Sequence, residues 1–145
     1  MVDLPYSAFV GLGMGIPALD WQHQGLFRTL YHLDEAMREG RIVAELDVVM
    51  DSLQKYAQHH FQDEEAHMRR IRYPGLDAHA AEHRRFLAQM ETLRIAFLAN
   101  GAQFHKRIPG HMLMRLTHHI RTQDMAYARH GQASRLEPPE VPQEE

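Results

Sequence analysis

Cysteine is absent from this 145-residue chain, and its absence removes several classes of site. Without thiols the chain has no disulfide framework, no iron–sulfur cluster and no zinc site built on thiolates. The sequence also lacks an apolar run of the length that a membrane span needs, about 18 residues. An acidic Asp3 stands where an export signal carries positive charge, and the short apolar stretch 8–16 contains three glycines. We therefore expect a cytoplasmic protein without membrane insertion.

An excess of basic residues is missing as well. The 16 Lys and Arg are outnumbered by 19 Asp and Glu, and no basic stripe stands out, which argues against nucleic acid as a partner. A chain of 145 residues is one domain by length and can bury a continuous core. The residue in excess is histidine, with 12 copies, and the function has to be sought there.

Four segments carry apolar residues at steps of three and four, the period of a helix with one buried face. They cover about 18–38, 43–70, 77–99 and 109–130, with Gly40, Pro74 and Gly101 among the residues that separate them. Because the connections are short, neighbouring helices should run antiparallel. The sequence predicts an all-α fold, an up-down-up-down antiparallel four-helix bundle over residues 18–130.

The two ends of the chain differ from this pattern. Residues 1–17 are predicted to form a non-helical N-terminal arm whose Tyr6, Phe9 and Val10 pack on the bundle. Residues 131–145 are predicted to form a disordered acidic tail, because this stretch is rich in proline and acids and poor in apolar residues.

Seven side chains able to bind metal interrupt the apolar stripes, at least one on each predicted helix. They are His23, His60, Glu64, His79, His83, His119 and Asp124. Residues four apart lie on one face of a helix, which holds for His60 with Glu64 and for His79 with His83. His119 and Asp124 are five apart, so an α-helix would place them off a common face.

Each of these elements has an ordinary explanation when it is taken singly. A His-x-x-x-Glu pair is usually a solvated ion pair, and a lone histidine is usually a core or surface residue. Burying five imidazoles and two carboxylates together without a metal would be costly, however. Seven such ligands are too many for one zinc, and their chemistry suits a first-row transition metal. The pattern predicts a two-metal centre, with iron as the metal, and places the other histidines on the surface except His67, which shares the face of His60.

The residues around these ligands resemble the hemerythrins, specifically the single-domain bacterial ones (bacteriohemerythrins). The matching segments are residues 15–23, 56–65, 73–86 and 119–124. The resemblance spans roughly residues 15–128, and all seven ligand positions hold the residue type expected in that family.

The resemblance implies a non-heme centre of two iron ions, joined by an oxo or hydroxo group, that binds O2 reversibly. One iron would be held by three histidines and the other by two, with one coordination position left open for O2. Both carboxylates would bridge the irons. In order, these residues are His79, His83 and His119 for the first iron, His23 and His60 for the second, and Glu64 and Asp124 for the bridges.

By the same resemblance, four apolar side chains would line an O2 pocket over the open iron: Leu26, Phe61, Leu116 and Ile120. One position departs from the family, which usually has tryptophan four residues before the histidine of the fourth helix. Here that position is Arg115. A charged side chain there bears on oxygen affinity and on the rate of autoxidation, and leaves the metal ligands unchanged.

The implied function is oxygen binding, for storage or for transport and delivery to an oxygen-consuming enzyme. Two alternatives stay open: a sensor of O2 or redox state that acts through a partner, and a di-iron enzyme such as an oxidase, peroxidase or nitric-oxide scavenger. Di-iron oxygenases typically use carboxylate-rich ligand sets. The histidine-rich set disfavours high-valent iron, so we expect an oxygen-binding protein that is not an enzyme, with at most weak secondary redox activity.

Overall fold

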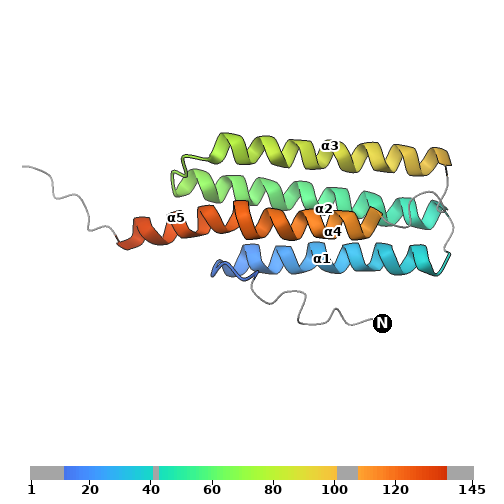
Figure 1. Cartoon of the computed structure of the whole chain (residues 1–145), viewed down its shortest axis with the longest axis horizontal. Coiled ribbons are helices and arrows are strands. Elements are labelled where there is room, and N and C mark those ends of the chain that lie inside the picture. The colour runs from blue at the N-terminus through green and yellow to red at the C-terminus, as the bar shows by residue number, and fades with distance from the viewer. Residues whose placement is uncertain (1–11, 41–42, 101–107, 137–145) are drawn as a thin grey trace, which may run out of the picture.

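The computed structural model describes residues 12–40, 43–100 and 108–136, and these residues form helices without any strand. The helices are α1 (Pro17–Arg38), α2 (Val43–Arg70), α3 (Leu76–Asn100), α4 (Ile108–His119) and α5 (Met125–Leu136), with the π-helical turn η3 (Ile120–Asp124) between the last two. Because α4, η3 and α5 form one continuous rod, four rods lie side by side, and Figure 1 shows that successive rods run in alternate directions. The predicted all-helical architecture is confirmed.

The ends of the bundle refine the sequence prediction. The last rod continues to Leu136, so residues 131–136, which we predicted to begin a disordered tail, are helical. Gly131 does not end the helix, and beside it His130 Nε2 lies 3.1 Å from the carbonyl oxygen of Ile71. Residues 137–145 and the predicted packing of the arm through residues 6, 9 and 10 lie outside the described residues.

Two apolar clusters fill the core, one on each side of a polar layer. The long apolar cluster includes Leu33, Leu46 and Phe97, and the short apolar cluster includes Leu19 and Tyr127. On every rod the predicted metal ligands stand in sequence between residues of the two clusters. Apolar burial on both sides therefore fixes the height of each polar side chain along the bundle.

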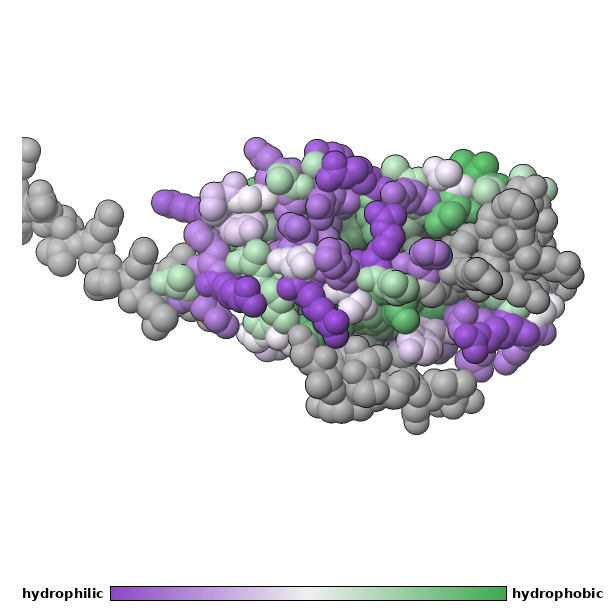
Figure 2. Space-filling view, in the orientation of Figure 1, coloured by the Kyte–Doolittle hydropathy of each residue, from purple (hydrophilic) through white to green (hydrophobic). Residues whose placement is uncertain are grey.

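The described surface carries both hydrophilic and apolar side chains (Figure 2). Figure 2 shows hydrophilic side chains over much of the described part of this face, with apolar side chains gathered mainly toward one end. Large exposed apolar side chains include Trp21 and Met114. Within the described ranges, no helix combines the length and the apolar character needed to cross a membrane. The cytoplasmic location stays a prediction from the sequence.

Candidate metal centre

The structure brings all seven predicted ligand side chains into one layer of the bundle. Each rod contributes at least one, and six of the seven expose 3 % of their surface or less: His23, His60, Glu64, His79, His83 and Asp124. The seventh, His119, is 14 % exposed at its side chain. The layer has two overlapping groups of donor atoms that share Glu64. We call His23 and His60 the histidine pair, and His79, His83 and His119 the histidine trio.

The carboxylate of Glu64 faces both groups, one with each oxygen. Its Oε1 lies 2.9 Å from Nε2 of His23 and 2.9 Å from Nε2 of His60, the histidine pair. Its Oε2 lies 3.1 Å from Nε2 of His83 and 3.7 Å from Nε2 of His79, in the trio. A carboxylate arranged in this way can serve two cations at once.

Asp124 has the same relation to the two groups. Its Oδ2 lies 3.1 Å from Nε2 of His23, in the pair. Its Oδ1 lies 3.0 Å from Nε2 of His79 and 3.0 Å from Nε2 of His119, in the trio. All five imidazoles thus direct Nε2 toward carboxylates that span the layer.

A π-helical turn explains how His119 and Asp124 meet although they are five residues apart. The helix changes from α to π at Ile120, and the backbone N–H of Met125 bonds the Ile120 carbonyl, five residues earlier. The wider π turn brings residues at this spacing onto one face, and π turns are often found at functional sites. Our objection to this pair, based on α-helical geometry, is therefore removed by the local change of helix type.

The donor atoms of the layer fit a bound cation. Among the described residues, Glu64 Oε2, His83 Nε2 and both Asp124 carboxylate oxygens are buried and make no hydrogen bond, because their contacts of 3.0–3.1 Å within the layer lack hydrogen-bond geometry. Nε2 of His79 and of His119 lie 3.1 Å apart, so two ring nitrogens face each other directly. Buried polar atoms left unsatisfied cost free energy. Imidazole nitrogen and carboxylate oxygen are a ligand set that first-row transition metals such as iron accept.

The charges within the layer favour ionised carboxylates. Burial would raise the pKa of Glu64, but His60 and the other imidazoles hold it well below its usual range. Burial and the charge of Glu64 would also raise the pKa of Asp124, yet His119 and His23 lower it to about 2. For His23, burial lowers the pKa, but Asp124 and Glu64 outweigh burial and raise it to about 9. A metal ion must therefore displace a proton from the layer.

Outer partners of the imidazoles were missed in the sequence analysis. Nδ1 of His60 lies 2.7 Å from Oε1 of Gln22, an amide oxygen that can accept its proton. Nδ1 of two trio histidines meets carboxylates, those of Glu65 and Glu82. Each partner stands directly beside a ligand in sequence but bonds a different ligand, so only the packed helices reveal the pairing.

Tyr127 is a further residue of the layer that was missed in the sequence analysis. Its side chain is fully buried, and its hydroxyl donates to Glu64 Oε1 at 3.2 Å. Burial raises the pKa of this hydroxyl, with the charge of Glu64 adding to the effect, so the group stays a donor. The available signal was its spacing, three residues after Asp124 on the same helical face. Tyr127 orients the carboxylate that both groups share.

The four side chains predicted to line an O2 pocket are all buried in the long apolar cluster: Leu26, Phe61, Leu116 and Ile120. Phe61 directly contacts the layer of predicted metal ligands, which we call the metal layer. Its ring stacks on His83 with centroids 4.0 Å apart. Apolar side chains therefore reach the layer from one side.

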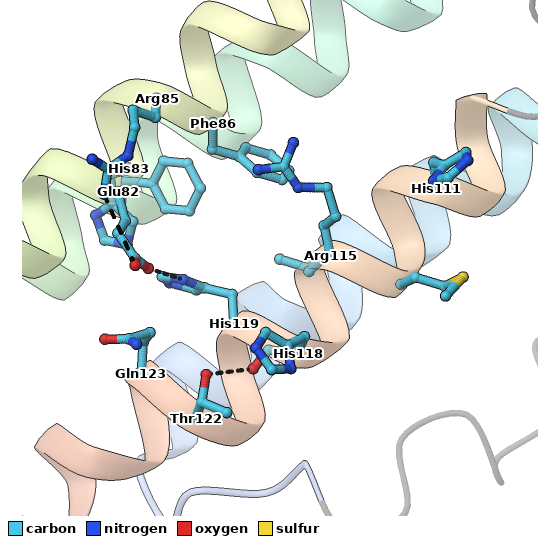
Figure 3. A pocket seen from close by; sticks show the side chains of 13 residues that line it. Glu82, His83, Arg85, Phe86, His111, Arg115, His118, His119, Thr122 and Gln123 are labelled. Carbon is cyan, nitrogen blue, oxygen red and sulfur yellow. Dashed lines mark hydrogen bonds and ion pairs between the residues drawn. The ribbon is translucent and has the colours of Figure 1, made fainter.

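A pocket of about 490 Å³ approaches the layer from outside, between α3 and the last rod. Figure 3 shows Glu82 and His83 on one wall and Arg115 and His119 on the other. Arg115 is exposed at this pocket, and its guanidinium donates to Gln89 on α3. The arginine therefore borders the route from solvent to the trio, and its charged end is held by a neighbouring helix.

The other described histidines occupy places outside the two groups of donor atoms. His67 is half-buried and packs 5.7 Å from the Tyr127 ring, so it lies beside the layer. His59 is exposed and paired with Asp63. His105 lies outside the described residues.

Comparison with known proteins agrees with this geometry. The family model described as the hemerythrin HHE cation binding domain matches residues 14–130, which include all seven predicted ligands. The chain belongs to the hemerythrin family. A bacteriohemerythrin of Stenotrophomonas maltophilia is 32 % identical over 117 residues, covering 81 % of this chain and 75 % of that protein. A bacteriohemerythrin of Pseudomonas aeruginosa is 30 % identical over 116 residues, covering 80 % of this chain and 74 % of that protein.

A third relative covers less of the chain. A bacteriohemerythrin of Campylobacter jejuni is 33 % identical over 85 residues, which is 59 % of this hemerythrin-family chain and 64 % of that protein. Membership of the family makes iron the expected metal for the layer, and the layer's donor atoms are of the type that iron accepts.

Proposed function

We propose that this hemerythrin-family chain binds O2 reversibly at a non-heme centre of two iron ions, for storage or for delivery to oxygen-requiring enzymes. The observation that supports this most is the placement of two buried carboxylates. Glu64 and Asp124 each turn one oxygen to the histidine pair and the other to the histidine trio. Two cations that share both carboxylates would satisfy buried donor atoms that otherwise lack partners.

The ligands divide between two positions in this proposal. The trio would hold one iron and the pair the other, with both carboxylates shared. In full, these are His79, His83 and His119, then His23 and His60, and finally Glu64 and Asp124. The pair offers one histidine fewer than the trio, so the ligand set itself leaves the room for O2 at that position. Two irons held here would supply the electrons for reversible O2 binding.

The surrounding residues have separate tasks in this proposal. Leu26, Phe61, Leu116 and Ile120 would exclude water from the side of the long apolar cluster. Tyr127 would hold Glu64 through its hydrogen bond to Oε1. The unit that carries the site would be an up-down-up-down antiparallel bundle over residues 18–130, a range that lies within residues 14–130 of the family model.

The test begins with the iron content of protein purified from iron-sufficient cultures, for which we expect two irons per chain. The anaerobically reduced protein should change its absorption spectrum when air is admitted and recover the first spectrum after evacuation. One zinc without iron would show that the two-iron proposal is wrong. A spectral change that evacuation does not reverse would favour a di-iron enzyme, and peroxidase or nitric-oxide consumption assays would then identify it.

A further inference from the structure

Three imidazoles of the metal layer are held at Nδ1 by a side chain from the preceding helix. The pairs are Gln22 Oε1 with His60 at 2.7 Å, Glu65 Oε2 with His83 at 3.2 Å, and Glu82 Oε2 with His119 at 3.3 Å. In chain order, α1 thus orients a ligand on α2, α2 orients one on α3, and α3 orients one on α4. The same arrangement, an acceptor oxygen at Nδ1 of an imidazole, occurs at three helix interfaces, but the group that supplies the oxygen differs.

The groups that hold Nδ1 differ in charge between the trio and the pair. The two partners in the trio are carboxylates, whereas the partner in the pair is a neutral amide. A carboxylate that accepts the Nδ1 proton makes an imidazole a stronger metal ligand, and an amide does so less. The amide is fixed in this role, because Nε2 of Gln22 donates to Asp63 Oδ2 at 2.6 Å and its oxygen faces His60.

We propose that Glu65 and Glu82 make the histidine trio the tighter of the two metal positions, so that a first equivalent of divalent metal is held there. This inference rests on the proposed two-metal function and specifies the order in which that centre fills. Three histidine ligands instead of two would by themselves give the trio the higher metal affinity. The inference is that the two carboxylates add to that preference beyond the number of ligands.

The two acids should contribute unequally. Glu65 is 20 % exposed at its side chain and bonds a fully buried histidine. Glu82 is 38 % exposed and shares its charge with the guanidinium of Arg85, 4.0 Å away. Since solvent and a competing cation weaken a charge interaction, Glu65 should have the larger effect on metal affinity.

The experiment is an anaerobic titration of the metal-free full chain with Co²⁺ in competition with a chelating dye. Wild type should bind two Co²⁺ in two steps. Glu65→Gln keeps an acceptor oxygen and removes the charge, so the first step should weaken about 10–100-fold, the range typical for outer partners of metal ligands. Glu82→Gln should weaken the first step less, and neither variant should alter the second step.

A matched control removes one charge elsewhere on α3. Glu91 accepts from Gln54 at an exposed position, so Glu91→Gln should leave both steps unchanged. The cobalt absorption band that develops in the first step should shift in Glu65→Gln and stay the same in Glu91→Gln. A role of Glu65 in packing alone would not move that band.

A reciprocal variant tests the inference by gain of affinity. Gln22→Glu combined with Asp63→Asn moves a carboxylate next to His60 and keeps the net charge of the chain. The asparagine amide replaces the lost acceptor with a donor, so the two new side chains remain compatible. The second step should tighten about 10–100-fold while the first stays unchanged, a result that poor folding cannot produce.

Each outcome has a definite meaning. Equal first steps in Glu65→Gln and Glu91→Gln, or an unchanged second step in the reciprocal variant, would overturn the inference. Wild type that binds fewer than two Co²⁺ would refute the two-metal proposal and the inference together. Wild type that shows both steps but no reversible O2 binding would refute only the proposed function, because the variants still report on the order of filling. Thermal melts of the metal-free variants by circular dichroism identify any that fail to fold.

Discussion

The long apolar cluster and the metal layer are buried to the same degree, yet opposite forces act on them. Phe97 and Leu46 in the cluster expose none of their surface, and neither do Glu64 and Asp124 in the layer. Burial of an apolar side chain stabilises the fold by roughly 1.5–3 kcal/mol. Burial of a charge opposes folding until a partner offsets it. The cluster is thus stabilised by its own burial, and the layer depends on what it binds.

The largest expected effect comes from removing the shared carboxylate. Glu64→Ala takes away a ligand from both metal positions, so the metal content should fall by more than one ion per chain. His79→Ala removes a ligand from the trio alone and should mainly empty one position. Metal analysis of the purified variants distinguishes the two cases. A Glu64→Ala protein that keeps both metals would show that this carboxylate is only an ion-pair residue.

The opposite result, lower stability with unchanged metal content, is expected for a substitution in the long apolar cluster. Phe97→Ala leaves a cavity far along the bundle from the layer and should lower the free energy of unfolding by about 3–5 kcal/mol. Its metal content should stay at the wild-type value, because no donor atom is touched. Urea unfolding and metal analysis check the two halves of this prediction. A loss of metal in a variant that is still folded would contradict the independence of the two regions.

Dependence on pH should separate the regions as well. The buried side chains of the long apolar cluster are all apolar, and burial raises the pKa of Tyr56, which packs against the cluster, above its ordinary value of 10. In the metal-free protein the pKa of His23 is raised from 6.5 to about 9. A raised folded pKa gives stabilisation that is fully present below about pH 6.5 and is lost as the pH rises through about 9. Urea midpoints of the metal-free chain should therefore fall over this interval.

The acidic side of the same experiment follows from Asp124. Its pKa is lowered from 3.8 to about 2, so its stabilisation is present above about pH 3.8 and is lost as the pH falls through about 2.

Bound metal displaces the His23 proton, so the alkaline fall should disappear in metal-loaded protein. His23→Gln should abolish that fall in the metal-free chain. His59→Gln, an exposed control, should retain it. An alkaline fall of the same size in His23→Gln would assign it to another group.

The smallest expected effect concerns the border between layer and solvent. Arg115 lines the outer pocket next to the buried Leu116 and is held by Gln89. Arg115→Trp should fill part of this pocket with an apolar ring, slow the entry of water, and moderately slow autoxidation of the oxygenated protein. Arg84→Trp, on the exposed surface of α3, is the matched control. Equal autoxidation rates in wild type and Arg115→Trp would mean that Arg115 has no influence on the centre.

Much of the fold follows from local patterns. The first three helices begin and end within a residue or so of the predicted segments. Gly40, with φ +69°, follows the end of α1, and Pro74 stands between α2 and α3, where it prevents one helix from running into the next. The fourth rod is longer than predicted: it continues past Gly131 to Leu136, and near Gly131 it contacts a distant part of the chain. His130 reaches the carbonyl of Ile71, and no local pattern contains that bond.

The candidate centre could likewise be predicted only in part from the sequence. Residue type and spacing along the sequence were enough to select the seven donor residues, since polar residues on an apolar stripe are costly unless something binds them. Only the tertiary structure decided how they meet. A π turn aligned His119 with Asp124, and packed helices gave His60 and His83 outer partners of different charge. The bonds of His60 and His83 to their outer partners join residues on different helices, so no spacing within one helix could have specified them.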